Sequence, residues 1–252
     1  MIIQSTFWWY LLVAPRVLLL GTLIALWRKD LNKQHRIFFY YIIYELVQFP
    51  FILYGILSRD ISADAYWKLY AVLLAGSVFL RFGVIYELFR NLSKTYPSLG
   101  RFNRFLFRAL TAVLLFIAIG LIASAWPGDV HQLTRFIANV LDRGVNILQL
   151  GLLLGLFGIA KFFRLSWRKH VFGITLGFAM YLSVQLMATA IQAEWGDYKI
   201  FDYITMATFH VTVLVWLFYV LLPERQTALT SVPDSADVTA WNREVERLLQ
   251  SK

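Results

Sequence analysis

Seven apolar stretches, each about as long as a membrane-spanning helix, constrain this chain more than any other feature. A span needs roughly 20 apolar residues, because the hydrocarbon core is about 30 Å thick and a helix rises about 1.5 Å per residue. Of the 252 residues, 59% are apolar, against about 45–50% in ordinary globular domains. We therefore predict an all-α integral membrane protein whose residues 1–222 form a seven-helix bundle. The predicted spans are 7–27, 37–57, 67–89, 105–126, 137–163, 171–192 and 200–222.

The charges between these stretches predict the orientation of the bundle. The first, third and fifth connections carry 13 Lys and Arg residues, whereas the second, fourth and sixth carry only 4. Basic connections are retained on the cytoplasmic side of a membrane, so we predict an outer amino terminus and a cytoplasmic carboxyl terminus. This arrangement suits a bacterial inner (cytoplasmic) membrane. It also explains the net charge of +9 without nucleic acid as a partner.

Residues 223–252 differ in composition from the bundle. Small and polar residues at 228–237 indicate a flexible linker. After it, Trp241, Val245 and Leu248 share one face of a predicted amphipathic helix. This helix is expected to pack on its own bundle or on lipid headgroups, or to dock a cytoplasmic protein partner. The sequence leaves the oligomeric state open.

Two charged side chains lie well inside the second and third apolar stretches. Glu45 and Arg81 each lie eight residues from the predicted cytoplasmic end of their span, about 12 Å deep. Because a charge in hydrocarbon is costly, such residues face the bundle interior and find partners. The equal depths predict a Glu45–Arg81 ion pair, with Gln48 one turn above Glu45 and Ser77 one turn above Arg81. Glu87, by contrast, is expected at a solvated helix end.

Polar residues also line one side of the fifth stretch at helical spacing, and others lie inside the first, sixth and seventh. One interpretation is a polar cavity lined by the fifth, sixth and seventh helices, with Arg16, Glu45 and Arg81 at its floor. The alternative is that these groups bond to one another and hold the helices in register. The candidate ligand-binding cluster comprises Arg16, Glu45, Gln48, Arg81, Asn139, Asp142, Asn146, Gln149, Gln185 and His210.

The sequence contains no pattern that indicates catalysis. Cysteine is absent, and the four histidines have no metal-ligand spacing. Glycine-rich phosphate loops and nucleophile elbows are also missing. We therefore expect no catalytic residues, no metal and no cofactor. Gly151 and Gly155 form a small-xxx-small pattern, which is typical of close helix packing.

The pattern YELVQFPFILYGI followed by YWKLYAVLLAGSVFLRF resembles the seven-helix membrane input modules that bacteria attach to sensor kinases. The resemblance covers the second and third stretches and implies a stand-alone input module. Microbial rhodopsins share the expected topology, but the last stretch has no mid-span lysine to carry retinal. We expect a non-enzymatic receptor- or sensor-like protein in the lipid bilayer. The alternatives are a transporter or channel subunit for a small polar solute or protons, and a structural subunit of a membrane complex.

Overall fold

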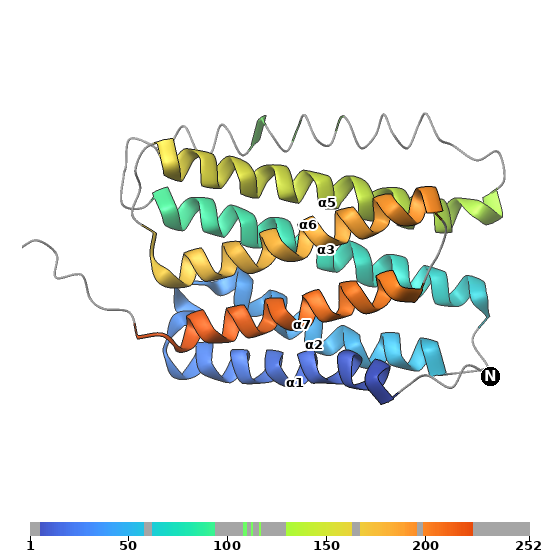
Figure 1. Cartoon of the computed structure of the whole chain (residues 1–252), viewed down its shortest axis with the longest axis horizontal. Helices are drawn as coiled ribbons and strands as arrows, with labels where there is room; N and C mark the ends of the chain where they lie inside the picture. Colours follow the sequence, from blue (N-terminus) through green and yellow to red (C-terminus); the bar gives the residue numbers. More distant parts are fainter. Residues whose placement is uncertain are drawn as a thin grey trace, which may run out of the picture. The chain divides into compact units, whose positions relative to one another are not determined.

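The computed structural model describes residues 6–57, 62–93, 108, 109, 112, 116, 130–162, 167–195 and 199–223, and these residues are helical apart from short connections (Figure 1). Six of the described helices are long and apolar enough to cross a membrane, as in a multi-pass integral membrane protein. The elements are α1 (Thr6–Arg28), the 3-10 helix η1 (Leu31–Lys33), α2 (Arg36–Leu57), α3 (Ala63–Ser93), α5 (Val130–Phe162), α6 (Lys169–Trp195) and α7 (Lys199–Leu221).

These six long helices coincide with six of the seven predicted spans. The fourth predicted span, 105–126, lies outside the described residues except at a few single positions, as does the predicted tail helix with Trp241, Val245 and Leu248. α3 and α5 are longer than predicted, beginning at Ala63 and Val130. Their first turns are polar, and the apolar pattern used for the prediction marks only the part that suits hydrocarbon.

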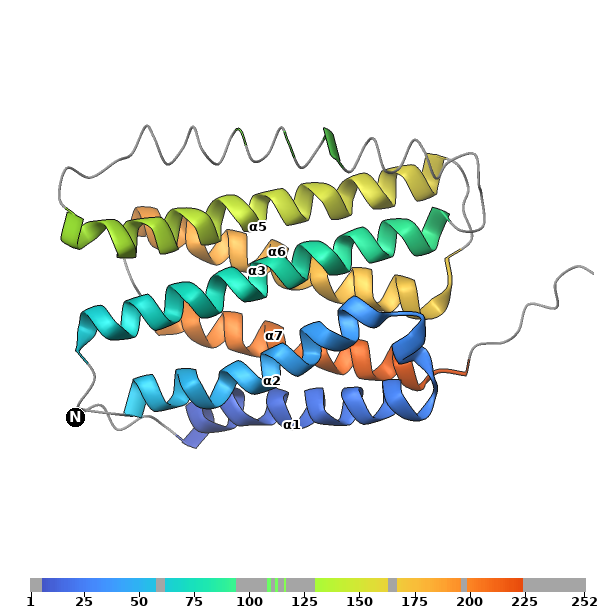
Figure 2. The same cartoon turned by 180° about the vertical axis from the view of Figure 1, so that it is seen from behind.

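The six helices pack in a closed ring. Each contacts the next in the order α1, α2, α3, α5, α6, α7, and α7 contacts α1 again, while α3 also reaches α6 across the ring. α3 and α5 run in the same direction, whereas α2 and α6 run opposite to them (Figures 1 and 2). α1 begins at one end of the bundle and α7 finishes at the other. We call the end that holds Arg28, Arg36, Arg90, Lys161 and Lys169 the basic end.

The apolar core occupies the half of the bundle next to the basic end, which we call the packed half. Its centre is a cluster of rings in which Trp216 lies 5.2 Å from Phe38 and 4.9 Å from Phe178, centroid to centroid. Such ring pairs add to the burial energy of a core. The fully buried members include Leu19, Leu26, Phe38, Ile42, Val84, Ile85, Leu152, Leu153, Leu156, Leu182, Val213 and Val220.

Close packing of α6 against α7 depends on two glycines. A Cβ at Gly173 would collide with the ring of Tyr219, and one at Gly177 with the indole of Trp216. These glycines are four residues apart, the small-xxx-small spacing. At Gly151, the first member of the other small-xxx-small pair, nothing in the described part of the chain lies within 4 Å of a Cβ. At Gly173 and Gly177 the missing Cβ is what lets the rings of Tyr219 and Trp216 lie against α6.

Polar contacts join the helix termini at the basic end. Lys29 Nζ donates to the carbonyls of Val220 and Leu221, at 2.9 and 2.6 Å, and so satisfies acceptors at the end of α7. Arg168 donates to Gln34 Oε1 at 3.3 Å, which connects the start of α6 to η1. A cation at the carboxyl end of a helix also suits the helix dipole.

Glu87 is not at a solvated end, contrary to the sequence prediction. Its side chain is only 1% exposed, and its carboxylate accepts the backbone amides of Ile37 and Phe38 at 3.1 Å. These amides lie in the first turn of α2, where they have no partner within their own helix. The carboxylate of α3 therefore caps the amino end of α2.

Candidate functional site

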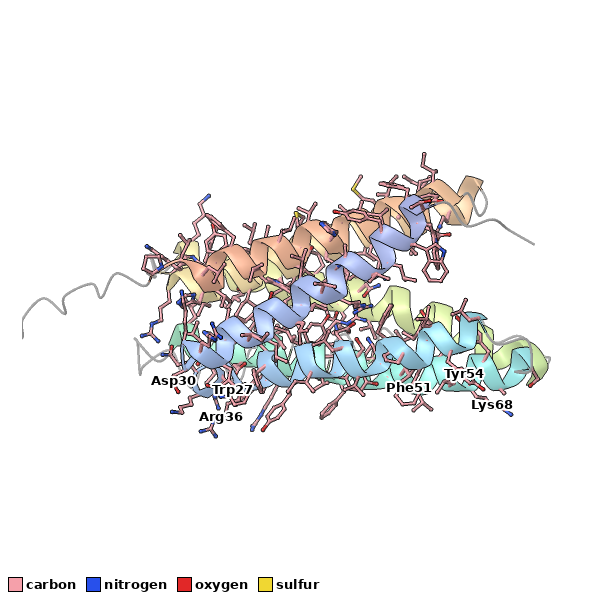
Figure 3. The ribbon with its side chains drawn as sticks, turned by 90° about the horizontal axis from the view of Figure 1, so that it is seen from below. Trp27, Asp30, Arg36, Phe51, Tyr54 and Lys68 are labelled. Atoms are coloured by element: carbon pink, nitrogen blue, oxygen red, sulfur yellow. The ribbon has the colours of Figure 1, made fainter. Side chains whose placement is uncertain are left out.

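A cavity of about 260 Å³ lies inside the ring, mainly in the half of the bundle away from the basic end. Side chains from α1, α2, α3, α6 and α7 line it. α1 and α2 diverge from their connected ends, and the labelled Arg36 and Lys68 mark opposite ends of the bundle (Figure 3). Tyr41 belongs to both the core and the cavity wall, so it marks the boundary between the two halves. The lining is Leu11, Leu12, Arg16, Tyr41, Glu45, Gln48, Ile52, Tyr70, Leu73, Leu74, Ser77, Arg81, Tyr181, Thr205, Met206 and Phe209.

The carboxylate of Glu45 is the centre of the polar wall. Oε2 accepts from Arg16 at 3.1 Å and from Gln48 Nε2 at 2.6 Å, while Oε1 accepts the hydroxyl of Ser77 at 2.9 Å. Gln48 reaches Glu45 because residues three apart share a helix face. Glu45, Gln48 and Ser77 are each less than 9% exposed. The buried negative charge is thus compensated by one cation and two neutral donors, as a buried charge requires.

Arg16 is the cation that pairs with Glu45. One of its terminal nitrogens donates to both the carboxylate and the backbone carbonyl of Glu45, at 3.1 and 3.3 Å. The rings of Phe49 and Phe209 lie 5.2 and 5.0 Å from its central carbon, within cation–π range. Arg16 Nε is buried and has no hydrogen-bond partner in the part of the chain that the structure describes.

Arg81 reaches Glu45 through Ser77. Its Nε donates to Ser77 Oγ at 3.2 Å, and a terminal nitrogen donates to Asn146 Oδ1 on α5 at 3.4 Å. The sequence predicted an ion pair between Glu45 and Arg81. In the structure, Glu45 instead forms its ion pair with Arg16. The prediction that both charges face the interior holds geometrically, since Glu45 is 6% and Arg81 7% exposed.

Among the side chains that the structure describes, those of α5 do not line the cavity, whose lining comes from α1, α2, α3, α6 and α7. Asn146 accepts from Arg81, and both Asn146 and Gln149, one turn further along α5, are completely buried. Asn146 Nδ2 and both polar atoms of Gln149 have no hydrogen-bond partner among the described residues. Asn139 and Asp142 belong to α5, but their side chains are outside the described part.

Two other predicted site residues lie away from the cavity lining. Gln185 is a half-buried residue of α6, and His210 is a half-buried residue of α7 whose ring lies 5.6 Å from that of Tyr10. His210 follows Phe209 in α7 but is not among the lining residues. The structure thus brings Arg16, Glu45, Gln48 and Arg81 together and places Gln185 and His210 elsewhere.

The sequence interpretation missed the aromatic part of the site. Tyr41, Tyr70, Tyr181 and Phe209 line the cavity beside the charged groups. Aromatic residues occur throughout this chain, at 17% of the sequence, so their presence alone could not identify these four. The one available signal was the step of four residues that places Tyr41 on the Glu45 face of α2.

No protein-family model, curated protein or solved structure matches this chain.

The geometry suits binding by hydrogen bonds and charge. The wall presents guanidinium, amide and hydroxyl groups, while its one carboxylate is already engaged by three donors. Within the described residues, no three His, Asp or Glu side chains come close enough together to hold a metal ion. The site can therefore orient a small polar molecule against Arg16 while its apolar part lies on leucines.

Proposed function

We propose that the protein is a non-enzymatic, receptor- or sensor-like membrane protein that binds a small ligand in the cavity around Arg16 and Glu45. The observation that carries this proposal is the cavity of about 260 Å³, whose wall holds charged and polar side chains: Arg16, Glu45, Gln48, Ser77, Arg81 and Thr205. Polar groups at membrane depth are expensive and mark functional sites by default. Helices that only needed to pack could have used apolar side chains there.

The packed half of the bundle favours a receptor over a channel. Below the cavity, Leu152, Leu156 and Trp216 are buried among the core residues that fill the packed half. A ligand would thus reach the site from one side only. Binding can change the conformation of the bundle only if the ligand binds one helix arrangement more tightly than another. α1 and α7 both contact the site and both extend to the basic end, where Lys29 joins them.

We propose seven spans, with the amino terminus outside. α1 starts and α7 finishes at opposite ends of the bundle, so the chain must cross an odd number of times. The six described helices are an even number, and α3 and α5 run in the same direction. The chain between Ser93 and Val130 has to return to the other end, and the apolar stretch 105–126 is long enough to do so. The basic residues then lie on the cytoplasmic side.

The ligand cavity is tested by filling it. Leu12→Trp adds an indole to the cavity wall, while Val13→Trp adds the same group at a neighbouring position that is 42% exposed and outside the lining. A library of small anionic, neutral and cationic compounds is screened by thermal stabilisation of the full chain in lipid nanodiscs. We expect at least one compound to stabilise the wild type and Val13→Trp but not Leu12→Trp. If no compound of any charge does so, the receptor proposal fails.

A transporter remains the second candidate, favoured by the unpartnered buried amides of Asn146 and Gln149. They extend polar chemistry from Arg81 about one helical turn along α5, toward the packed half. Flux of a cavity ligand into proteoliposomes, abolished by Gln149→Leu, would favour transport. Binding without flux would favour the receptor.

A further inference from the structure

The balance of donors and acceptors in the cavity limits what the ligand can be. Glu45, the carboxylate of the wall, accepts three hydrogen bonds from Arg16, Gln48 and Ser77. Its lone pairs are therefore largely used within the protein. A cationic or donor-rich ligand would have to displace one of these bonds, which gains little because it replaces one interaction by another.

Arg16, in contrast, has donors to spare. A guanidinium carries five N–H donors, and the bonds that Arg16 makes in the described structure all come from one terminal nitrogen. Its Nε is buried without a hydrogen-bond partner among the described residues, which is unfavourable for any polar group. Phe49 and Phe209 hold the guanidinium in place from two rings. A carboxylate is the group that matches the fork of a guanidinium most closely.

The charge of the wall points in the same direction. Among the described lining residues, Arg16 and Arg81 are cations and Glu45 is the one anion, so the lining favours an anionic ligand over a cationic one.

The remaining wall is apolar, and the volume is modest. Leu11, Leu12, Ile52 and Met206 face the cavity together with the ring of Phe209. A dry cavity of about 150 Å³ can hold benzene, so about 260 Å³ has room for a ring with a charged group attached.

We propose that the cavity binds a small organic monoanion, with a carboxylate or similar group at Arg16 and an apolar body against the leucine wall. This inference rests on the proposed function, since it names the chemical class of ligand for the same site.

The test compares three probes of one shape and different charge. Benzoate, benzamide and benzylamine carry an anionic, a neutral and a cationic group on the same ring. Binding to the full chain in nanodiscs of zwitterionic lipid is measured by thermal shift and calorimetry, with chloride as a separate probe. We expect benzoate to bind about 10- to 100-fold more tightly than benzamide, as for hydrogen bonds to charged groups, and benzylamine not to bind.

A double variant locates the binding. Arg16→Gln with Glu45→Gln removes both members of the ion pair, so that neither charge is left alone. We expect benzoate to bind about 10- to 100-fold more weakly to it. Arg36→Gln is the matched control, since Arg36 is an exposed arginine at the basic end. If the double variant does not fold, the comparison of the three probes on the wild type still decides the charge class.

Several results would overturn the inference. They are no benzoate binding, equal binding of benzamide or benzylamine, full reproduction of the effect by chloride, and unchanged benzoate affinity in a folded double variant. In each case the receptor proposal stands or falls separately, on whether any library compound distinguishes Leu12→Trp from Val13→Trp.

Discussion

Three hydrogen bonds reach the carboxylate of Glu45 from three places: Arg16 on α1, Gln48 on α2 and Ser77 on α3. A typical interhelical hydrogen bond in a membrane protein contributes only about 0.6 kcal/mol. The contribution here is larger because one acceptor is charged and buried, so the loss of a partner leaves a charge uncompensated. Glu45 thus joins three helices at the depth of the cavity.

Glu45→Gln tests this role. The substitution keeps the size of the side chain but removes the charge that pairs with Arg16. We expect the variant to lose about 2 kcal/mol of stability, as for a hydrogen bond to a charged group, measured by thermal or denaturant unfolding in detergent. Asp30→Asn is the control, because the Asp30–Lys33 pair has both side chains more than 70% exposed. An exposed pair contributes at most about 1 kcal/mol, so equal losses in the two variants would contradict the role of Glu45.

At this scale the sequence predicted the buried charges but not their partners. The inward placement of Glu45 and Arg81 follows from the cost of charge in hydrocarbon. Arg16 could not be assigned to Glu45, because the pairing depends on where α1 crosses α2 in space. Equal depth on neighbouring helices made Arg81 the obvious partner, and Ser77, one turn away, lies between the two groups. Depth along a helix is readable from a sequence, whereas rotation about its axis is much less so.

At the scale of the elements, helix pairs are set by contacts that the apolar pattern does not record. α6 and α7 approach through Gly173 and Gly177, onto which the rings of Tyr219 and Trp216 pack. α3 and α2 are joined by the carboxylate of Glu87. Hydropathy predicted these helices and their order along the chain, but each contact requires two particular residues to meet in three dimensions.

Gly177→Ala is expected to destabilise the bundle. The new methyl group collides with the indole of Trp216, which is 1% exposed and donates its Nε1–H to the carbonyl of Ile174 at 3.2 Å. Overpacking of this kind costs about 1–3 kcal/mol. Gly151→Ala places the same group in open space and gains helix propensity, so it should be neutral or stabilising. A comparison of melting temperatures checks the pair, and a Gly177→Ala variant as stable as the wild type would show that α6 and α7 can separate at no cost.

Glu87→Ala is expected to loosen the first turn of α2. Without the carboxylate, the amides of Ile37 and Phe38 lose the acceptor that α3 supplies, at a cost of about 2 kcal/mol. Hydrogen exchange at these two amides should accelerate more than exchange in the middle of α2. Arg90→Ala changes an exposed neighbour on the same helix and should leave both amides unaffected. Unchanged exchange in Glu87→Ala would mean that water caps α2 equally well.

At the scale of the whole molecule, the bundle has two unlike halves. The packed half is filled by leucines and by the rings around Trp216, whereas the other half contains the cavity and the polar groups that surround it. The sequence predicted the membrane helices and a polar interior. The division into halves was not predicted, because it depends on which polar and apolar residues of different helices lie at the same height.

Orientation is directly testable because the chain has no cysteine. Lys33→Cys and Lys68→Cys introduce single thiols at opposite ends of the bundle, both at exposed lysines. With the basic end in the cytoplasm, a membrane-impermeant maleimide should label Lys68→Cys in intact cells and Lys33→Cys only after permeabilisation. The reverse pattern would invert the proposed topology, and labelling of both in intact cells would show that the bundle has no fixed orientation.

The division into halves also affects how the transmembrane voltage acts on the site. A cavity that opens to water has a higher effective dielectric constant than packed apolar side chains, so most of the transmembrane voltage drop would fall across the packed half. Moving one elementary charge through 100 mV changes its free energy by about 2.3 kcal/mol. An anion that stops at Arg16 passes through only the small part of the voltage drop that lies across the cavity half. The occupancy of the site should therefore follow the ligand concentration outside the cell and respond little to the energised state of the membrane.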